Sequence, residues 1–461
     1  MSHNGRRGFL LAALAGAFFN VHAAPAEYNL LDVYNMALEN DAQLAAAKAS
    51  MQATQEGVSQ SRALLLPNLA LKANTQYNKT SAETTTGPDR KDNYNSHGWG
   101  ATLNQPLFNL NSWFKADQAK ATSAQAEAVF ASEQQQLILR VSEAYFNVLK
   151  AEDTLMTAKA QEKAVKQQLD QARERFNVGL IAETDVLEAQ AAYDNARVAR
   201  IQGENQLSVS YEGLRTIVNH DVTGIAKLEK SMPVLAPVPT AAEEWVNKAV
   251  NNNLSLRASR EGLKVSEDSL RASKSGHAPT LNAFASYNYN SSNADQQGQP
   301  LTGKGHQSVV GVQFDLPIFF GGATSSASRQ AGYQLEQAQQ NFDKLLRETN
   351  SNTRNLLRTA TSDVERVQAR CQGITSSESA LKATQSGYEV GTRNITDVLD
   401  AQQKLYSSTS DYLNARYEFI VNTLKLKQVA GTLSPGDLEE LNQWMTGSAS
   451  SAELSIPAEC R

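Results

Sequence analysis

The sequence predicts a mainly α-helical protein with a small β portion, in which one structural unit occurs twice. A pattern of aromatic residue, x, Val, Gly, followed by Asp-Val-Leu and Ala-Gln, occupies residues 176–190 and returns 212 residues later at 388–402. Long stretches rich in Ala, Gln and Leu predict extended helices. Two pairs of alternating apolar and polar stretches, each following a proline, predict hairpins of strands. The chain is therefore a duplication made mainly of helices.

The composition favours long polar helices over one thick globular core. Only 7% of the 461 residues are aromatic and 20% are charged, as expected for helices with narrow apolar seams. The net charge is -5, whereas a nucleic-acid-binding protein usually carries a basic surface. The six histidines are scattered, and neither a phosphate-binding glycine loop nor a His-x-x-x-His pair occurs. We therefore expect no enzymatic activity, no metal and no cofactor.

The N-terminus resembles an export signal, which we assign to residues 1–23. Arg6 and Arg7 precede an apolar run over 9–19, and Ala23 ends a small-x-small cleavage site. The arginine pair also resembles a twin-arginine signal, so both export routes remain open. No later stretch approaches the roughly 18 unbroken apolar residues of a transmembrane helix, so a role in a membrane would depend on strands.

The chain contains two cysteines. Cys371 falls in a helical stretch and Cys460 is the penultimate residue. An oxidising compartment permits a single disulfide, but two cysteines in such different places are as compatible with free thiols, so their pairing is left open.

Each repeat is expected to contain a helix, two strands, a long helix and a shorter helix. The leading helix of the first repeat runs from Tyr28 to about Leu65 and ends before Pro67, and its counterpart ends before Pro279, 212 residues later. The first repeat spans residues 24–220, with strands at about 68–78 and 95–107 and helices at about 111–176 and 182–219. The second spans residues 241–433, with strands at about 280–290 and 307–319 and helices at about 323–388 and 394–431. A connector with prolines, residues 221–240, joins the repeats, and a tail follows at 434–461.

The strands are expected to cross a membrane. Leu69, Leu71 and Tyr77 alternate with polar residues, which gives one apolar and one polar face. A small soluble sheet would explain that alternation equally well. However, each strand has about ten residues, the length that a tilted strand needs to cross a bilayer, and Trp99 and Phe314 lie toward strand ends as interfacial residues do. Four strands cannot close a barrel, so the barrel must be shared among subunits.

The long helices are expected to form coiled coils. Residues 111–176 contain neither proline nor glycine, and about 65 helical residues would span roughly 100 Å. Gly179 and Gly391 occupy the positions of C-caps that end these helices. Beyond Gly391, apolar residues recur every seven positions from Val398 to Leu433, which indicates supercoiling against a neighbouring helix.

Taken together, the repeat, the signal, the paired hairpins and the motifs at 176–180, 388–393 and 397–401 resemble the TolC family of outer-membrane channel proteins. The resemblance covers the chain from Tyr28 to Trp444. It implies a homotrimer in which three four-stranded contributions form one twelve-stranded barrel in the outer membrane, with a helical tunnel in the periplasm. It also implies an exit duct for type I secretion or drug efflux, which works with a periplasmic adaptor and an inner-membrane transporter of the ABC or RND type. No cysteine follows the expected cleavage site, which separates the chain from the lipidated efflux branch.

The resemblance also implies a gate at the periplasmic end of the tunnel. Asp397 and Asp400 lie three residues apart on one helical face, and three chains would bring their carboxylates into one ring that attracts cations. The alternative is that they are ordinary first-turn acids, stabilised by the helix dipole. By resemblance, the residues that hold the gate closed are Tyr388, Arg393, Thr184 and Asp185. A solvated surface charge is the alternative for Arg393.

A different class of protein remains possible on the helices alone. A periplasmic coiled-coil adaptor or scaffold without its own pore would also carry an export signal and long helices. Such a protein has no need for four alternating strands of membrane-crossing length, so the channel is the preferred interpretation. The sequence does not identify the transported substrate.

Overall fold

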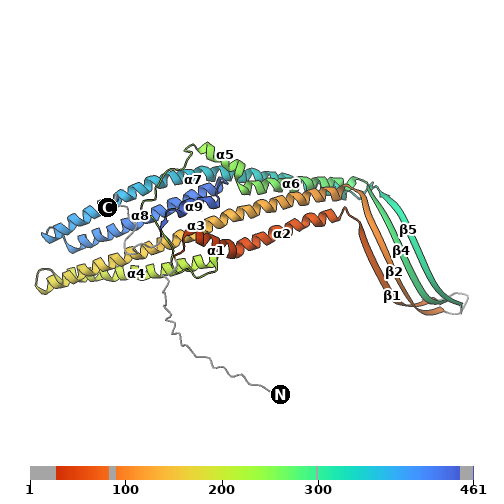
Figure 1. Ribbon diagram of the computed structural model, residues 1–461, viewed down its shortest axis with the longest axis horizontal. Coiled ribbons are helices and arrows are strands. Elements are labelled where there is room, and N and C mark those ends of the chain that lie inside the picture. Colours follow the sequence, from red (N-terminus) through yellow and green to blue (C-terminus); the bar gives the residue numbers. More distant parts are fainter. Residues whose placement is uncertain (1–26, 83–89, 297–298, 447–459, 461) are drawn as a thin grey trace, which may run out of the picture.

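The computed structural model describes residues 27–82, 90–296, 299–446 and 460. The predicted signal peptide and most of the C-terminal tail lie outside these residues. The helices form one long body, and a four-stranded sheet projects from one end of it (Figure 1). No helix within the described ranges is both long enough and apolar enough to cross a membrane.

Two very long helices extend along the body. Helix α3 (Leu110–Asn177) has 68 residues and α7 (Ala323–Glu389) has 67, which corresponds to about 100 Å each. Each reverses into a shorter antiparallel partner, α4 (Glu183–Val218) or α8 (Ile395–Val429). All four helices begin and end within two residues of the ranges expected from the sequence.

The leading helix of each repeat differs from the expectation, because it is broken into two. The Asp41 carboxylate accepts a hydrogen bond from the backbone N–H of Leu44 at 2.6 Å and caps a new helix. Asn253 does the same for the N–H of Leu256 at 2.9 Å. A capping side chain offers the backbone an alternative to continuing the previous helix. The resulting helices are α1 (Leu30–Asn40), α2 (Ala42–Ala63), α5 (Ala242–Asn252) and α6 (Leu254–Lys274).

The sheet is antiparallel in the order β1-β2-β4-β5, so β1 and β5 are its two edges. Its strands are β1 (Asn68–Ala82), β2 (Arg90–Asn109), β4 (Thr280–Gln296) and β5 (Gln299–Asp315). They are longer than the roughly ten residues expected, because the polar stretches between the two predicted strands of each pair continue the ladder, as the pair Ser291 and Lys304 illustrates. The register shifts between Pro106 and Phe108, where proline has no N–H to donate.

The main apolar core lies about halfway along the helical body. It includes Leu137, Val141 and Phe146 of α3, which pack with residues of α1, α4 and α8. Within it, the Tyr145 hydroxyl donates to the backbone carbonyl of Ala226 at 2.6 Å. Four short elements complete the fold: the 3-10 helix η1 (Ser275–His277), the helix α9 (Pro435–Asn442) and the paired strands β3 (Lys227–Leu228) and β6 (Met445–Thr446).

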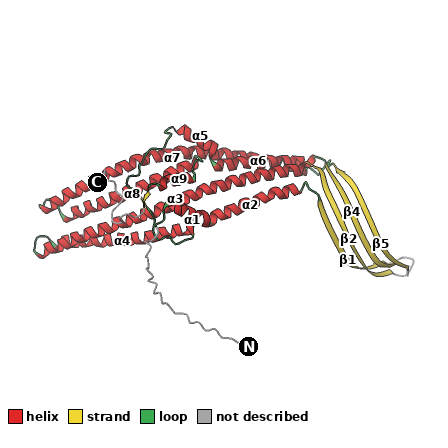
Figure 2. Cartoon of the chain, in the orientation of Figure 1, coloured by secondary structure: helices red, strands yellow, loops and turns green. Residues whose placement is uncertain are grey.

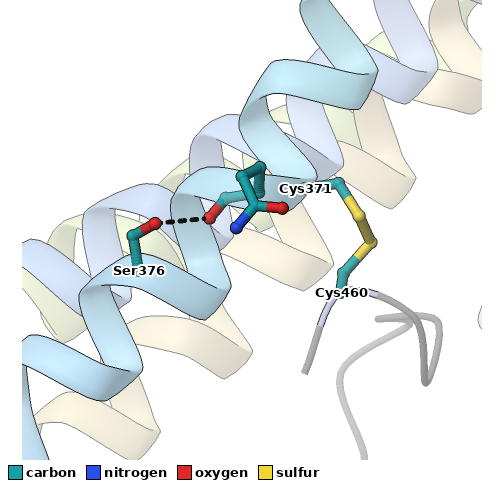
Figure 3. Close-up of a disulfide and its surroundings, with 4 residues drawn as sticks. Cys371, Ser376 and Cys460 are labelled. Atoms are coloured by element: carbon teal, nitrogen blue, oxygen red, sulfur yellow. Dashed lines mark hydrogen bonds between the residues drawn. A yellow bond between two sulfur atoms is a disulfide. The ribbon is translucent and has the colours of Figure 1, made fainter.

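A disulfide joins the C-terminal end of the chain to the C-terminal third of α7 (Figure 3). It links Cys371 to Cys460 across a sequence separation of 89 residues. Cys460 is only 2% exposed and belongs to the main core. The question left open by the sequence is thereby answered in favour of pairing.

Candidate functional site

The two turns that join the long helices to their partners lie together at the end of the body opposite the sheet (Figure 1). In each turn one glycine has a positive φ, 78° for Gly179 and 76° for Gly391. Each ends its helix as expected: the N–H of Leu180 bonds the Arg175 carbonyl at 2.9 Å, and the N–H of Thr392 bonds the Gly387 carbonyl at 2.8 Å. Residues with a Cβ are strained at such φ values, so these glycines set where each helix reverses.

Asp397 has a defined local role in the first turn of α8. It forms a capping box, in which its backbone N–H donates to the Asn394 side chain at 2.8 Å and its carboxylate accepts from the Asn394 N–H at 3.3 Å. The Arg393 guanidinium lies 3.8 Å from the same carboxylate, with the two side chains 60% and 39% exposed. In the single chain, both residues therefore have the local roles weighed as alternatives from the sequence.

Asp400 is exposed one turn further along α8. It lines an open groove of about 900 Å³ between α3, α4 and α8. Glu188 of α4 and Thr396 of α8 lie on the same groove and are joined by a hydrogen bond from the Thr396 hydroxyl to the Glu188 carboxylate. Most of the other residues that line the groove are Ala, Gln, Asn and Ser, so along its length the two repeats face each other mainly through small and polar side chains.

The Tyr388 ring lies beside α3. The Arg175 guanidinium stacks over it at 4.9 Å from the ring centroid, a cation–π contact between the ends of α3 and α7. Thr184 and Asp185 make no side-chain hydrogen bond or ion pair in the described part of the chain. The single chain thus does not bring Tyr388 and Arg393 onto Thr184 and Asp185, and that pairing stays a prediction for contacts between chains.

A small apolar cluster of buried residues from α3, α4 and α8 lies near the two turns, and Tyr388 of α7 packs against it. It contains Val165, Leu169, Ala172, Ala189, Ile395 and Leu399. Sequence reasoning missed this cluster together with Arg175, Glu188 and Thr396. The repeat carried part of the signal, because Glu188 and Asp400 occupy equivalent positions 212 residues apart, as do Thr184 and Thr396.

At the end of the groove farther from the turns, two adjacent acids of α3 accept hydrogen bonds from tyrosines of two different helices. The Tyr417 hydroxyl of α8 donates to Asp153 at 2.5 Å, and the Tyr211 hydroxyl of α4 donates to Glu152 at 2.6 Å. We call these four residues the tyrosine clasp. Burial raises the pKa of both carboxyls, and the hydrogen bond from each tyrosine offsets part of that increase in pKa. The clasp joins α3 to α4 and α8 at the end of the groove farther from the turns.

Metal binding has no support in the described residues, among which no group of three or more His, Cys, Asp or Glu side chains could hold an ion. The acids near the turns are instead distributed along helix faces.

Comparisons with known proteins identify the architecture. The family model described as "Outer membrane efflux protein" matches twice, over residues 33–220 and 245–432, which are again 212 residues apart. Outer membrane protein TolC of Vibrio cholerae is 36% identical over 90% of this chain and 93% of its own length. TolC of Escherichia coli is 32% identical over 90% of this chain and 84% of its own. Alkaline protease secretion protein AprF of Pseudomonas aeruginosa is 28% identical over 93% and 90%.

Solved structures agree on the fold. The Campylobacter jejuni CmeC outer membrane channel superposes with a TM-score of 0.74 at 16% identity, covering 94% of this chain and 90% of that one. These findings confirm the resemblance to the TolC family and the expected fold of a helical tunnel with a small barrel. The chain therefore belongs to the outer membrane efflux protein family.

Proposed function

We propose that three copies of this chain form an exit duct through the outer membrane, with the helical body projecting into the periplasm. The observation that carries the proposal is the four-stranded sheet at one end of the body, whose outer strands β1 and β5 each have one unpaired edge within the described residues. Unpaired N–H and C=O groups are costly in a bilayer. Pairing β5 of one chain with β1 of the next would remove every edge and give twelve strands, enough to enclose a lumen.

The periplasmic end of the duct would be closed by charged residues that only the trimer brings together. Asp397 and Asp400 of three chains would place six carboxylates around one constriction, which favours cations over anions. Tyr388 and Arg393 would meet Thr184 and Asp185 across the boundary of neighbouring hairpins. Each such contact is individually modest, which suits a closure that a partner protein must open.

The gate can be tested by substituting its closing residues. Arg393→Ser combined with Tyr388→Phe is expected to raise the conductance of the closed channel in planar bilayers. Arg347→Ser, on an exposed stretch of α7 far from both turns, is the control and should leave the conductance unchanged. Equal conductance of the double variant and the parent protein would place the closing contacts elsewhere.

The partners are inferred from exposed apolar residues at the two turns and from the names of the relatives. Val178, Leu180 and Val390 are 70 to 75% exposed at the two turns, which suits docking of a periplasmic adaptor (membrane fusion) protein. Relatives include proteins named for protease secretion and for cobalt-zinc-cadmium resistance. We infer that an inner-membrane ABC or RND-type transporter selects the cargo, a secreted protein or a toxic small molecule, and that this chain has no catalytic activity of its own.

Fractionation and conductance test the proposal directly. The protein is expected in outer membranes as an SDS-resistant trimer, and the purified trimer should form pores in planar bilayers. Recovery as a soluble periplasmic protein without pores would instead support the scaffold alternative. Cross-linking followed by purification would then identify the adaptor and the transporter.

A further inference from the structure

The strand register sorts the side chains of the sheet into rows that run across all four strands on one face. We call this the apolar face. Near the helical body, one row consists of Leu69, Leu103, Ala285 and Val310. Because rows on one face are separated by two residues, they follow each other at about 6.8 Å along the strands. The chemistry of the rows changes in order from the helical body to the far end of the sheet.

The row formed by Ala73, Trp99, Tyr289 and His306 marks the end of the apolar part. The centroids of the Trp99 and Tyr289 rings lie 6.5 Å apart, and those of Tyr289 and His306 lie 5.1 Å apart. The hydroxyl of Tyr287, one row earlier, hydrogen-bonds to Nδ1 of His306 at 2.9 Å. Such aromatic girdles lie at the boundary between hydrocarbon and headgroups. From Phe314 to this row the strand spans about 27 Å, close to the height of a barrel's apolar band.

The next row, one step beyond the aromatic girdle, is polar and basic. It consists of Thr75, His97, Ser291 and Lys304, and Lys79 follows two rows further on. The side chains of Lys79, His97 and Lys304 are exposed. Among the described side chains, the apolar face carries no Asp or Glu.

The opposite face of the sheet provides the contrast. Its rows are rich in Asn, Gln and Gly, as in the row formed by Lys72, Gly100, Asn288 and Gln307. Asn288 and Asn290 lie so close over Gly100 and Gly98 that a Cβ on either glycine would approach an amide oxygen to 2.5 Å or less. This face therefore presents an amide surface, suited to water, on which Lys72 is the one lysine among the described residues.

We propose that Lys304, together with His97 and Lys79, binds the phosphate groups of lipids in the outer leaflet of the outer membrane. The proposal rests on the proposed function, which places the apolar face against lipid and the far end of the sheet outside. Figure 2 shows the four strands extending away from the helical body. An amphiphile fits because its acyl chains would lie along the apolar rows while its headgroup reaches the basic row. A soluble anion would gain only the charges.

Lipid binding by the purified trimer tests the inference. The probe is the diphosphorylated glycolipid lipid A, compared with the same lipid after enzymatic removal of its phosphates, and bound lipid is counted by native mass spectrometry. Lys304→Gln is expected to weaken binding of the phosphorylated form about fivefold, and Lys79→Gln combined with Lys304→Gln about twenty-five-fold. The dephosphorylated lipid should bind equally to all variants.

Lys72→Gln is the matched control, because it removes an exposed lysine from the same sheet but from the opposite face. It should not change lipid binding. Equal losses for Lys72→Gln and Lys304→Gln, or no dependence on lipid phosphate, would overturn the inference. Full competition by millimolar inorganic phosphate would also contradict it, because the site would then recognise free phosphate rather than lipid.

Pore formation separates this inference from the proposed function. All variants should retain the conductance of the parent trimer. A parent protein that forms no pores would refute the exit duct itself, whereas normal pores with lipid binding indifferent to Lys304 would refute the phosphate row alone.

Discussion

Tyr417→Phe removes one hydroxyl from the tyrosine clasp and should destabilise the protein. The Tyr417 and Asp153 side chains are each 5% exposed, and their hydrogen bond of 2.5 Å joins α8 to α3. Phenylalanine keeps the ring and its contact with Phe146, whose centroid lies 5.9 Å away. The substitution therefore tests the hydrogen bond with little change in packing.

The expected cost is about 1–3 kcal/mol, since a buried acceptor is left without its donor. The cost should depend on pH. Burial already raises the pKa of Asp153 above 3.8, and the hydrogen bond from Tyr417 lowers it. Without that bond the folded-state pKa rises further. An acid whose pKa is raised on folding stabilises the protein fully below the unfolded pKa and loses that contribution as pH rises through the folded pKa. The variant should thus be more destabilised at pH 8 than at pH 4.5.

Urea unfolding of the full-length protein in detergent, followed by circular dichroism at both pH values, measures the effect. Tyr211→Phe is the matched control, because it removes the hydroxyl that donates to Glu152 at a less buried position. It should lower the free energy of unfolding by less than Tyr417→Phe does. The reasoning is refuted if both variants lose equal stability, or if the loss from Tyr417→Phe is the same at both pH values.

Three further outcomes are expected. Cys371→Ser should lower the free energy of unfolding by about 4–5 kcal/mol, because the disulfide closes a loop of 89 residues. The variant should unfold at a lower urea concentration than the oxidised parent, and at the same concentration as the reduced parent. Gly391→Ala should lower the free energy of unfolding by about 1–2 kcal/mol because Gly391 has a positive φ. Gly332→Ala within α7, where the space for a Cβ is open, should instead raise it by about 0.5–1 kcal/mol. Equal effects of the two substitutions on urea unfolding would show that the turn does not need glycine. Asp397→Ala combined with Asp400→Ala should weaken channel block by a trivalent cation on the order of tenfold, and an unchanged block in single-channel recordings would remove the acidic ring.

The elements whose signals are local could be predicted from the sequence. The turns at Gly179 and Gly391 and the long helices follow from patterns within a few tens of residues. The repeat follows from comparing two such stretches that lie 212 residues apart. The breaks at Asp41 and Asn253 also had a local signal, since both are common capping residues. They were missed because helical composition continues on either side of each break.

Contacts between distant segments could not be predicted in the same way. Asp153 and Tyr417 are 264 residues apart, and nothing near either residue indicates its partner. Pairing of Cys371 with Cys460 depends on the path of the tail. The predicted contacts of Arg393 with Thr184 and Asp185 require neighbouring chains, so one chain alone leaves them a prediction.

The disulfide makes the two turns that join the long helices to their partners distinguishable by proteolysis. It makes the part of α7 that follows Cys371, its turn and α8 members of a covalent ring from Cys371 to Cys460. Cleavage by a protease at residues 390–394 would open this ring without releasing a fragment, so the pieces would separate on a denaturing gel only after reduction. Cleavage at residues 178–182 lies outside the ring and would release fragments at once. A bound partner that shields one tip could thus be assigned to that tip from a pair of gels.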